Sequence, residues 1–277
     1  MQWIDTHVHL FSDKIGDNTG IPNLKSTGGL NTPAVYYEQL EGNMPHGVVV
    51  VDFSKAQTSD HVINSLDELK NMNIYAAGII KGNMSDERTL AWLKRDDIKG
   101  IRLYALAGVP DISGDAYKEA FSYMEQSNKH VLVFGSAENL IALINQIPEG
   151  IKVLVDHLGL PCIDKEDEAF AGLLKLAKKR GNVYFKGPGY RTSLDIDKVS
   201  PVIKQIVSEV GFNRLILGAS DAPFAGPVME KDPKYAGKSY CDLMDYKKVL
   251  EFITELAHDT GEPNIVLYEN AKELYGF

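Results

Sequence analysis

The 277-residue sequence has only two cysteines, Cys162 and Cys241, and no long run of apolar residues. Two cysteines this far apart do not make a disulfide framework, and they favour reduced thiols in a reducing compartment. Without an apolar run of membrane-spanning length, a transmembrane segment is not expected. The opening Met1-Gln2-Trp3 also lacks the basic and apolar regions of a signal peptide. We therefore expect a cytoplasmic protein with no membrane partner.

The sequence also lacks an excess of basic residues. Its 29 Lys and Arg stand against 38 Asp and Glu, which gives a formal net charge of -9. This balance argues against nucleic acid as a partner, because binding it requires a basic face. A small anionic substrate is still possible, since it needs only a few well-placed cations. The composition, 44% hydrophobic and 24% charged, is typical of a globular domain, but it does not predict an oligomeric state.

Two histidines end the first apolar stretch, Ile4-Asp5-Thr6-His7-Val8-His9-Leu10-Phe11. Side chains alternate between the two faces of a β-strand, so His7 and His9 are expected to point the same way. Two converging imidazoles suit a metal site or a catalytic site without metal. They also suit a solvated strand edge, and the pair alone does not decide between these.

Strands and helices alternate along the rest of the chain. Apolar runs predict further strands, and each is followed by residues at helical spacing; the runs are 47–53, 74–80, 100–104, 130–134, 152–157, 182–186 and 214–218. Eight such units predict an α/β protein, a single (β/α)8 TIM barrel over residues 1–277. An open doubly wound sheet is the alternative. The long Gly- and Asn-rich stretch 12–33 is expected to be a binding loop or lid.

The active site of such a barrel lies at the carboxyl ends of its strands. Of the seven histidines, only His7, His9 and His157 fall there, and Asp221 follows the last strand. Alternation places His157 on the face of Val153 and Val155, and it places Asp221 on the face of Leu215 and Leu217. The other histidines are expected elsewhere, namely at the opposite mouth (His46, His130) or on helix surfaces (His61, His258). Lys186 is expected to point inward in alternation with Tyr184.

The chain resembles the amidohydrolase-related branch of the metallo-dependent hydrolase barrels, and within it the pyrone dicarboxylate lactonases and sugar lactonases. The matching segments are 4–11, 99–103, 155–161 (Val-Asp-His-Leu-Gly-Leu-Pro), 186–191 (Lys-Gly-Pro-Gly-Tyr-Arg), 217–223 (Leu-Gly-Ala-Ser-Asp-Ala-Pro) and 269–274. The resemblance implies hydrolysis with Asp221 as general base on a water. It implies that His7, His9 and His157 polarise the substrate carbonyl or hold a metal.

Four further residues are expected to bind substrate. The resemblance assigns Arg102 and Arg191 to substrate carboxylates, which guanidinium groups bind bidentately. Ser54, just past the second strand, and Tyr104, on the face of Arg102, are candidates from position alone. A salt bridge within the barrel mouth is the structural alternative for Arg102.

The resemblance has departures that affect the metal and the substrate. Tyr104 and Phe134 stand where a two-metal site would need ligands, so a binuclear site is not expected. His7, His9, His157 and Asp221 offer donors for a single divalent metal, with zinc the best candidate. The similar lactonases work without metal, so a metal-free site is equally expected. Ala222 and Phe224 replace residues that line the pocket in relatives, and specificity is expected to reside in loops 12–33 and 223–238.

The predicted function is therefore that of a cytoplasmic hydrolase that opens a lactone of a carboxylated or sugar-derived substrate with Asp-activated water. One alternative on the same barrel is a zinc-dependent, non-oxidative decarboxylase of a small aromatic or unsaturated acid. A ligand-binding barrel without catalysis is the least favoured, because a pure binder has little use for a general base among imidazoles.

Overall fold

The computed structural model describes residues 2–11, 31–230 and 232–277. Eight parallel strands follow one another around a single sheet in sequence order. The strands are β1 (Asp5–Val8), β2 (Val48–Val51), β3 (Ala76–Lys81), β4 (Ile98–Ala105), β5 (His130–Gly135), β6 (Val153–Val155), β7 (Val183–Lys186) and β8 (Leu215–Ile216). Each of the eight predicted strands is present, with ends that differ by a few residues.

Backbone hydrogen bonds between β1 and the segment after β8 close the sheet into a barrel. The N–H of Thr6 donates to the carbonyl of Gly218 at 2.8 Å, and the N–H of His9 donates to that of Ala222 at 2.8 Å. In return, the N–H of Asp221 donates to the carbonyl of His7 at 2.7 Å. The (β/α)8 barrel is thereby confirmed, and the open doubly wound sheet is excluded.

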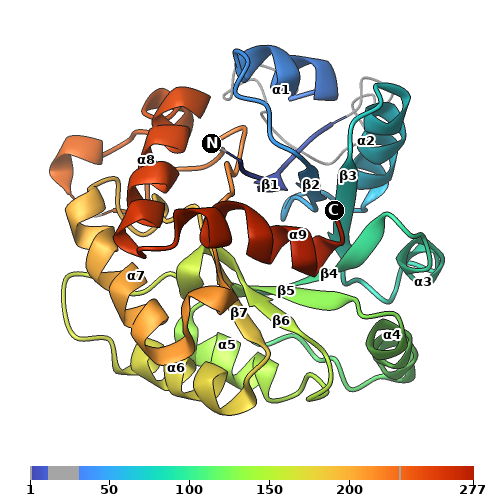
Figure 1. Ribbon diagram of the computed structural model, residues 1–277. Coiled ribbons are helices and arrows are strands. Elements are labelled where there is room, and N and C mark those ends of the chain that lie inside the picture. Colours follow the sequence, from blue (N-terminus) through green and yellow to red (C-terminus); the bar gives the residue numbers. More distant parts are fainter. Residues whose placement is uncertain (1, 12–30, 231) are drawn as a thin grey trace.

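Helices surround the sheet (Figure 1). Within the described residues they are α1 (Pro33–Gln39), α2 (Asp60–Asn71), α3 (Arg88–Leu93), α4 (Asp115–Gln126), α5 (Ala137–Ile144), α6 (Glu168–Arg180), α7 (Ile196–Val210), α8 (Tyr246–Asp259) and α9 (Asn270–Tyr275). Side-chain caps begin several of them: Thr32 accepts from the Val35 N–H, and Asp167 accepts from the Phe170 N–H. These caps satisfy N–H groups that have no partner within the helix.

Two hydrophobic clusters correspond to the two faces of the sheet. The larger lies between strands and helices, whereas the smaller joins buried inward residues of five strands, among them Val49, Leu154 and Ile216. The smaller cluster also includes Leu274 and Tyr275 of α9. Figure 1 shows α9 lying across one end of the barrel. Because β1 and β8 lead to the polar residues at the other end, α9 leaves that mouth available for a site.

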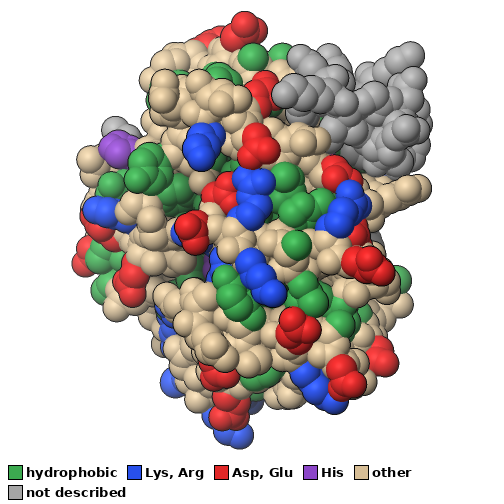
Figure 2. Space-filling view, turned by 90° about the vertical axis from the view of Figure 1, so that its right-hand side faces the viewer, with side chains coloured by type: hydrophobic (Ala, Val, Ile, Leu, Met, Phe, Trp, Pro, Cys, Tyr) green, Lys and Arg blue, Asp and Glu red, His purple; other side chains and the backbone are tan. Residues whose placement is uncertain are grey.

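The molecular face in Figure 2 carries acidic and basic side chains interspersed with apolar ones. No region of a single charge sign dominates that face. Among the described helices, none combines the length and apolar character needed to cross a membrane.

Candidate active site

His7 and His9 face the same point, as the strand alternation predicts. Their Nε2 atoms lie 3.3 Å apart, and both side chains are buried. His9 is fixed by a 2.8 Å hydrogen bond from its Nδ1 to the carbonyl oxygen of Val51. The Oδ1 atom of Asp221 lies 3.5 Å from the Nε2 of His7 and 3.7 Å from that of His9. The structure therefore brings the opening pair and the predicted base together.

His157 and Asp221 reach this point by a route that strand alternation did not predict. Val153 and Val155 pack in the outer cluster and Leu154 in the inner one, so the expectation that His157 continues the inward face of the valines is wrong. The same correction applies to Asp221, because Ile216 rather than Leu215 faces inward.

A left-handed backbone brings both side chains to the mouth. His157 has φ 49° and Asp221 has φ 58°, a conformation that is uncommon outside glycine. β6 ends at Val155, and a 3-10 turn over Asp156–Gly159 follows it. Each unusual residue thus redirects the chain just past a strand end. Such strain is concentrated at functional sites.

Asp156 is the polar residue that the sequence reasoning missed. Its carboxylate is fully buried, and it accepts from Arg102 Nη2 at 2.5 Å. It also lies 3.3 Å from Lys186 Nζ and 3.1 Å from His7 Nδ1. Counting alternation from Leu154 would have turned Asp156 inward. The prediction that Lys186 points inward is confirmed.

Arg191 binds the predicted base directly. Its Nε donates to Asp221 Oδ2 at 2.5 Å, its Nη2 contacts the same oxygen, and its Nη1 donates to the Ala225 carbonyl. Tyr190 donates its hydroxyl hydrogen to Oδ2 at 3.1 Å, and the guanidinium stacks on the Tyr240 ring. Oδ2 is therefore occupied by protein donors, whereas Oδ1 faces the imidazoles.

Arg102 is likewise paired within the protein. Besides Asp156, it donates from Nη1 to the carbonyl of Asp52 at 2.8 Å, and its buried Nε has no partner among the described residues. Tyr104 lies beside it and donates to the Asp52 carboxylate at 2.9 Å. Ser54 is exposed near this end of the barrel. The structural alternative for Arg102, a salt bridge in the mouth, is present.

The buried imidazoles are neutral at neutral pH. Burial lowers the pKa of His7 to about 3 and that of His157 to about 4, and it lowers the pKa of His9 well below its usual value. Each ring therefore has one N–H donor and one acceptor nitrogen. The His157 Nδ1 is buried and has no hydrogen-bond partner among the described residues.

Burial and neighbouring charges also shift the pKa values of Asp221 and Lys186, which lie around these rings. Burial alone would raise the pKa of Asp221, but Arg191 and the three imidazoles outweigh it and hold that pKa well below its usual range. Burial lowers the pKa of Lys186 to about 8 despite the nearby Asp156. At neutral pH the site thus contains an ionised Asp221 and a mainly protonated Lys186.

His7, His157 and Asp221 could hold a metal ion. Their donor atoms lie within 4.8 Å of one another and all three residues are buried. Nitrogen and carboxylate oxygen donors suit Zn²⁺ and similar divalent ions. His9, the fourth predicted ligand, is not part of this group, although its Nε2 faces the same point.

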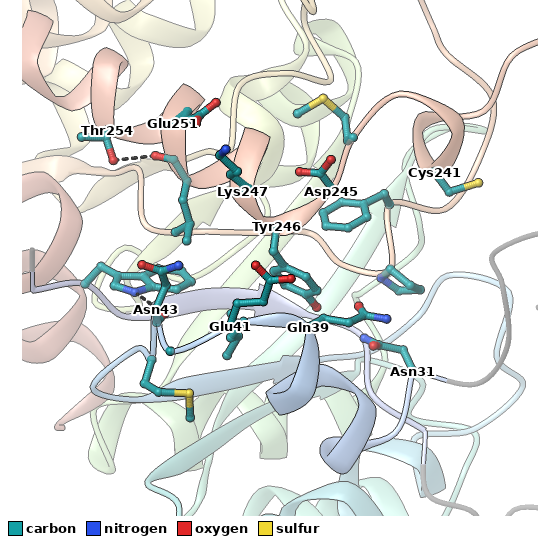
Figure 3. Close-up of a pocket in the computed structure, with 18 of the residues that line it drawn as sticks. Asn31, Gln39, Glu41, Asn43, Cys241, Asp245, Tyr246, Lys247, Glu251 and Thr254 are labelled. Carbon is teal, nitrogen blue, oxygen red and sulfur yellow. Dashed lines mark hydrogen bonds between the residues drawn. The ribbon is translucent and has the colours of Figure 1, made fainter.

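A separate cavity of about 1510 Å³ lies between α1 and α8. In Figure 3, Asn31, Gln39 and Tyr246 lie toward one side of it, and Glu251 and Thr254 lie toward the other. None of the predicted catalytic residues lines it. The predicted loop 12–33 falls almost entirely on residues 12–30, outside the described residues.

The structure also tests the predicted positions of His61 and His130. His61 was expected on a helix surface, but it is buried, and its Nε2 accepts the N–H of Phe53 at 3.1 Å. This helix start packs beneath the β2 loop, which the amphipathic pattern alone did not reveal. His130 is buried at the start of β5, as expected for the opposite mouth.

A closed barrel with buried histidines and an aspartate at its carboxyl mouth defines an enzyme of the (β/α)8 class. The chain belongs to the amidohydrolase family (Amidohydro_2), whose model matches residues 4–277. This confirms the resemblance seen in the sequence and makes the protein a hydrolase. A search of curated proteins found no match.

Solved structures with the same fold include two candidate 2-pyrone-4,6-dicarboxylic acid hydrolases. One, from Acinetobacter baumannii with citric acid bound, is 22% identical with a TM-score of 0.78, and covers 100% of each chain. The other, from Pseudomonas putida, is 21% identical with a TM-score of 0.79, and covers 99% of this chain and 97% of its own.

A third similar structure is the 5-carboxyvanillate decarboxylase of Novosphingobium aromaticivorans, in complex with manganese and 4-hydroxy-3-methoxy-5-nitrobenzoic acid. It is 12% identical with a TM-score of 0.63, and covers 100% of this chain and 96% of its own. At these identities the three similarities establish the shared fold.

Proposed function

We propose that this protein opens the lactone ring of a small carboxylated substrate by hydrolysis. One observation carries the proposal: Asp221 presents Oδ1 to the Nε2 atoms of His7 and His9 at 3.5 and 3.7 Å, while protein donors hold its other oxygen. A fixed carboxylate beside neutral imidazoles is suited to accept a proton from water at a carbonyl centre.

In the proposed reaction, water attacks the lactone carbonyl and its proton passes to Oδ1 of Asp221. A carbon–oxygen bond forms to the water oxygen, and the ring carbon–oxygen bond then breaks. Asp221 returns the proton to the leaving ring oxygen, which its low pKa favours. A hydrogen bond from a neutral imidazole N–H at the mouth would stabilise the oxyanion between these steps, and His9 would not supply it because its N–H donates to the Val51 carbonyl.

The arginines support an anionic substrate. Arg102 has a buried Nε without a partner among the described residues, and Arg191 lies at the same mouth with 13% of its side chain exposed. Both would bind substrate carboxylates through N–H groups that do not already donate to protein acceptors. The candidate hydrolase from Acinetobacter baumannii, which has citric acid bound, is in keeping with a polycarboxylate as ligand.

A metal is compatible with this site but is not required by the steps above. His7, His157 and Asp221 would hold it. A bound divalent ion would polarise the carbonyl and lower the pKa of water. The same donor group favours a second candidate function, the decarboxylation of a small aromatic or unsaturated acid.

Substrate panels with two readouts test the proposal. Purified protein is incubated with 2-pyrone-4,6-dicarboxylate, sugar lactones and aromatic acids, each with and without zinc. Hydrolysis releases a proton at constant pH, whereas decarboxylation consumes one and yields carbon dioxide. Proton release with a carboxylated lactone supports the proposal. Carbon dioxide from an acid, with no lactone opened, would replace it by the decarboxylase.

Asp221→Asn tests the assignment of the base. We expect loss of turnover with an unchanged fold by circular dichroism, because an amide cannot accept the proton. Asp67→Asn is the matched control, since Asp67 lies on the outer helix α2 and its side chain is 58% exposed. Activity retained by Asp221→Asn would rule out Asp221 as the base.

A further inference from the structure

The Nδ1 atom of His7 has two polar neighbours, and each requires a different protonation of that nitrogen. Asp156 Oδ1, at 3.1 Å from Nδ1, is a carboxylate oxygen that only accepts. Lys186 Nζ, at 2.9 Å from the same Nδ1, is an ammonium that only donates. Nδ1 must carry a proton to bond Asp156, and it must present a lone pair to bond Lys186. The two contacts therefore favour opposite tautomers of His7.

The contact that Nε2 of His7 makes with His9 decides between these tautomers. His9 carries its proton on Nδ1, because that atom lies 2.8 Å from the Val51 carbonyl, which can only accept. The Nε2 of His9 therefore carries a lone pair and no proton, and it faces His7 Nε2 at 3.3 Å. With no cation between them, this contact is a hydrogen bond only if His7 is protonated on Nε2. Its Nδ1 is then the acceptor that Lys186 requires.

A metal ion demands the reverse arrangement. A histidine that binds metal through Nε2 carries its proton on Nδ1 and donates it to a carboxylate or carbonyl behind it. Asp156 is placed for that role. Lys186 opposes it twice, by competing for the Nδ1 lone pair and by placing a buried positive charge beside the ligand.

We propose that Lys186 is a positioning residue that keeps the proton of His7 on Nε2 and thereby weakens divalent metal binding at His7, His157 and Asp221. Lys186 and Asp156 compete for one nitrogen, and their balance selects between a metal-free and a metal-bound site. This role of Lys186 concerns the metal ligands and does not depend on which substrate the enzyme takes.

Zinc affinity of a lysine variant tests this directly. Lys186→Met removes the donor and the charge but keeps most of the side-chain volume. Zinc affinity is measured by isothermal titration calorimetry after treatment with a chelator. We expect the variant to bind zinc at least about tenfold more tightly than the unmodified protein, in line with the effects of groups behind metal ligands. Adding His7→Gln should abolish the gain.

Lys129→Met is the matched control. Lys129 is also a buried lysine, but it donates to the carbonyls of Arg95 and Ile98 next to the start of β5, at the opposite end of the barrel. Its removal should leave zinc affinity unchanged. Equal affinities of Lys186→Met and the unmodified protein would overturn the proposal, as would an equal gain in Lys129→Met.

The histidine tautomers of the unmodified protein give a second measurement if Lys186→Met does not fold. Long-range proton–nitrogen NMR spectra of ¹⁵N-labelled, chelator-treated protein distinguish a proton on Nε2 from one on Nδ1. His7→Gln identifies the signals of that ring. We expect Nε2–H for His7 and Nδ1–H for His9. A proton on Nδ1 of His7 in the metal-free protein would overturn the proposal.

Discussion

Replacing Asp156 by asparagine should remove the main electrostatic support of the site. The Asp156 carboxylate is fully buried between Arg102 Nη2 at 2.5 Å and Lys186 Nζ at 3.3 Å. Asparagine keeps the volume, so no cavity forms, but both buried cations lose their counter-ion. Breaking a buried pair from one side costs about 3–5 kcal/mol. We expect Asp156→Asn to lower the free energy of unfolding by that amount.

Urea denaturation measures this loss. With an m-value of about 3 kcal/mol/M, the midpoint should fall by roughly 1–1.7 M. Asp67→Asn is the control, because the Asp67 side chain is 58% exposed and pairs with Arg95 at 2.7 Å on the surface. Exposed pairs contribute about 0–1 kcal/mol, so the control should unfold close to the unmodified protein. A loss below about 1 kcal/mol in Asp156→Asn would refute the role given to this carboxylate.

Two further predictions concern pH and packing. Burial raises the pKa of Asp52 to about 7, so the folded protein binds this proton more tightly than the unfolded chain does, and the Asp52 contribution to stability falls as pH rises from about 4 to 7. The buried His7, His9 and His157, whose pKa values are lowered, act in the opposite direction and make total stability rise with pH. Asp52→Asn should steepen that rise in urea denaturation across this range, and an unchanged slope would contradict the assignment. Gly100→Ala should cost more than about 3 kcal/mol or prevent folding, because its Cβ would lie 1.9 Å from the His130 carbonyl oxygen. Gly114→Ala, whose Cβ meets nothing within 4 Å, should change thermal stability little, and similar losses in both variants would disprove the steric explanation.

Much of the fold followed from the sequence because parallel strands buried on both faces have a strong local signal. The run Val48–Val51 is apolar on both faces and forms β2 as predicted. His7 and His9 share a direction because alternation holds within one short strand. Burial of His61 was not predictable, since its place depends on the β2 loop packed against the start of α2.

The order of strands and polar residues along the chain is enough to place His7, His9, His157 and Asp221 at the carboxyl ends of strands, and therefore at one mouth of the barrel. The way in which their side chains meet depends on the packed barrel. Alternation gave the wrong inward face before both His157 and Asp221, and a left-handed residue at each position corrects the direction. For Asp221, barrel closure holds that conformation through the hydrogen bond from its N–H to the His7 carbonyl. The competition of Lys186 and Asp156 for one nitrogen of His7 likewise exists only once the closed barrel brings the ends of β1, β6 and β7 around one interior.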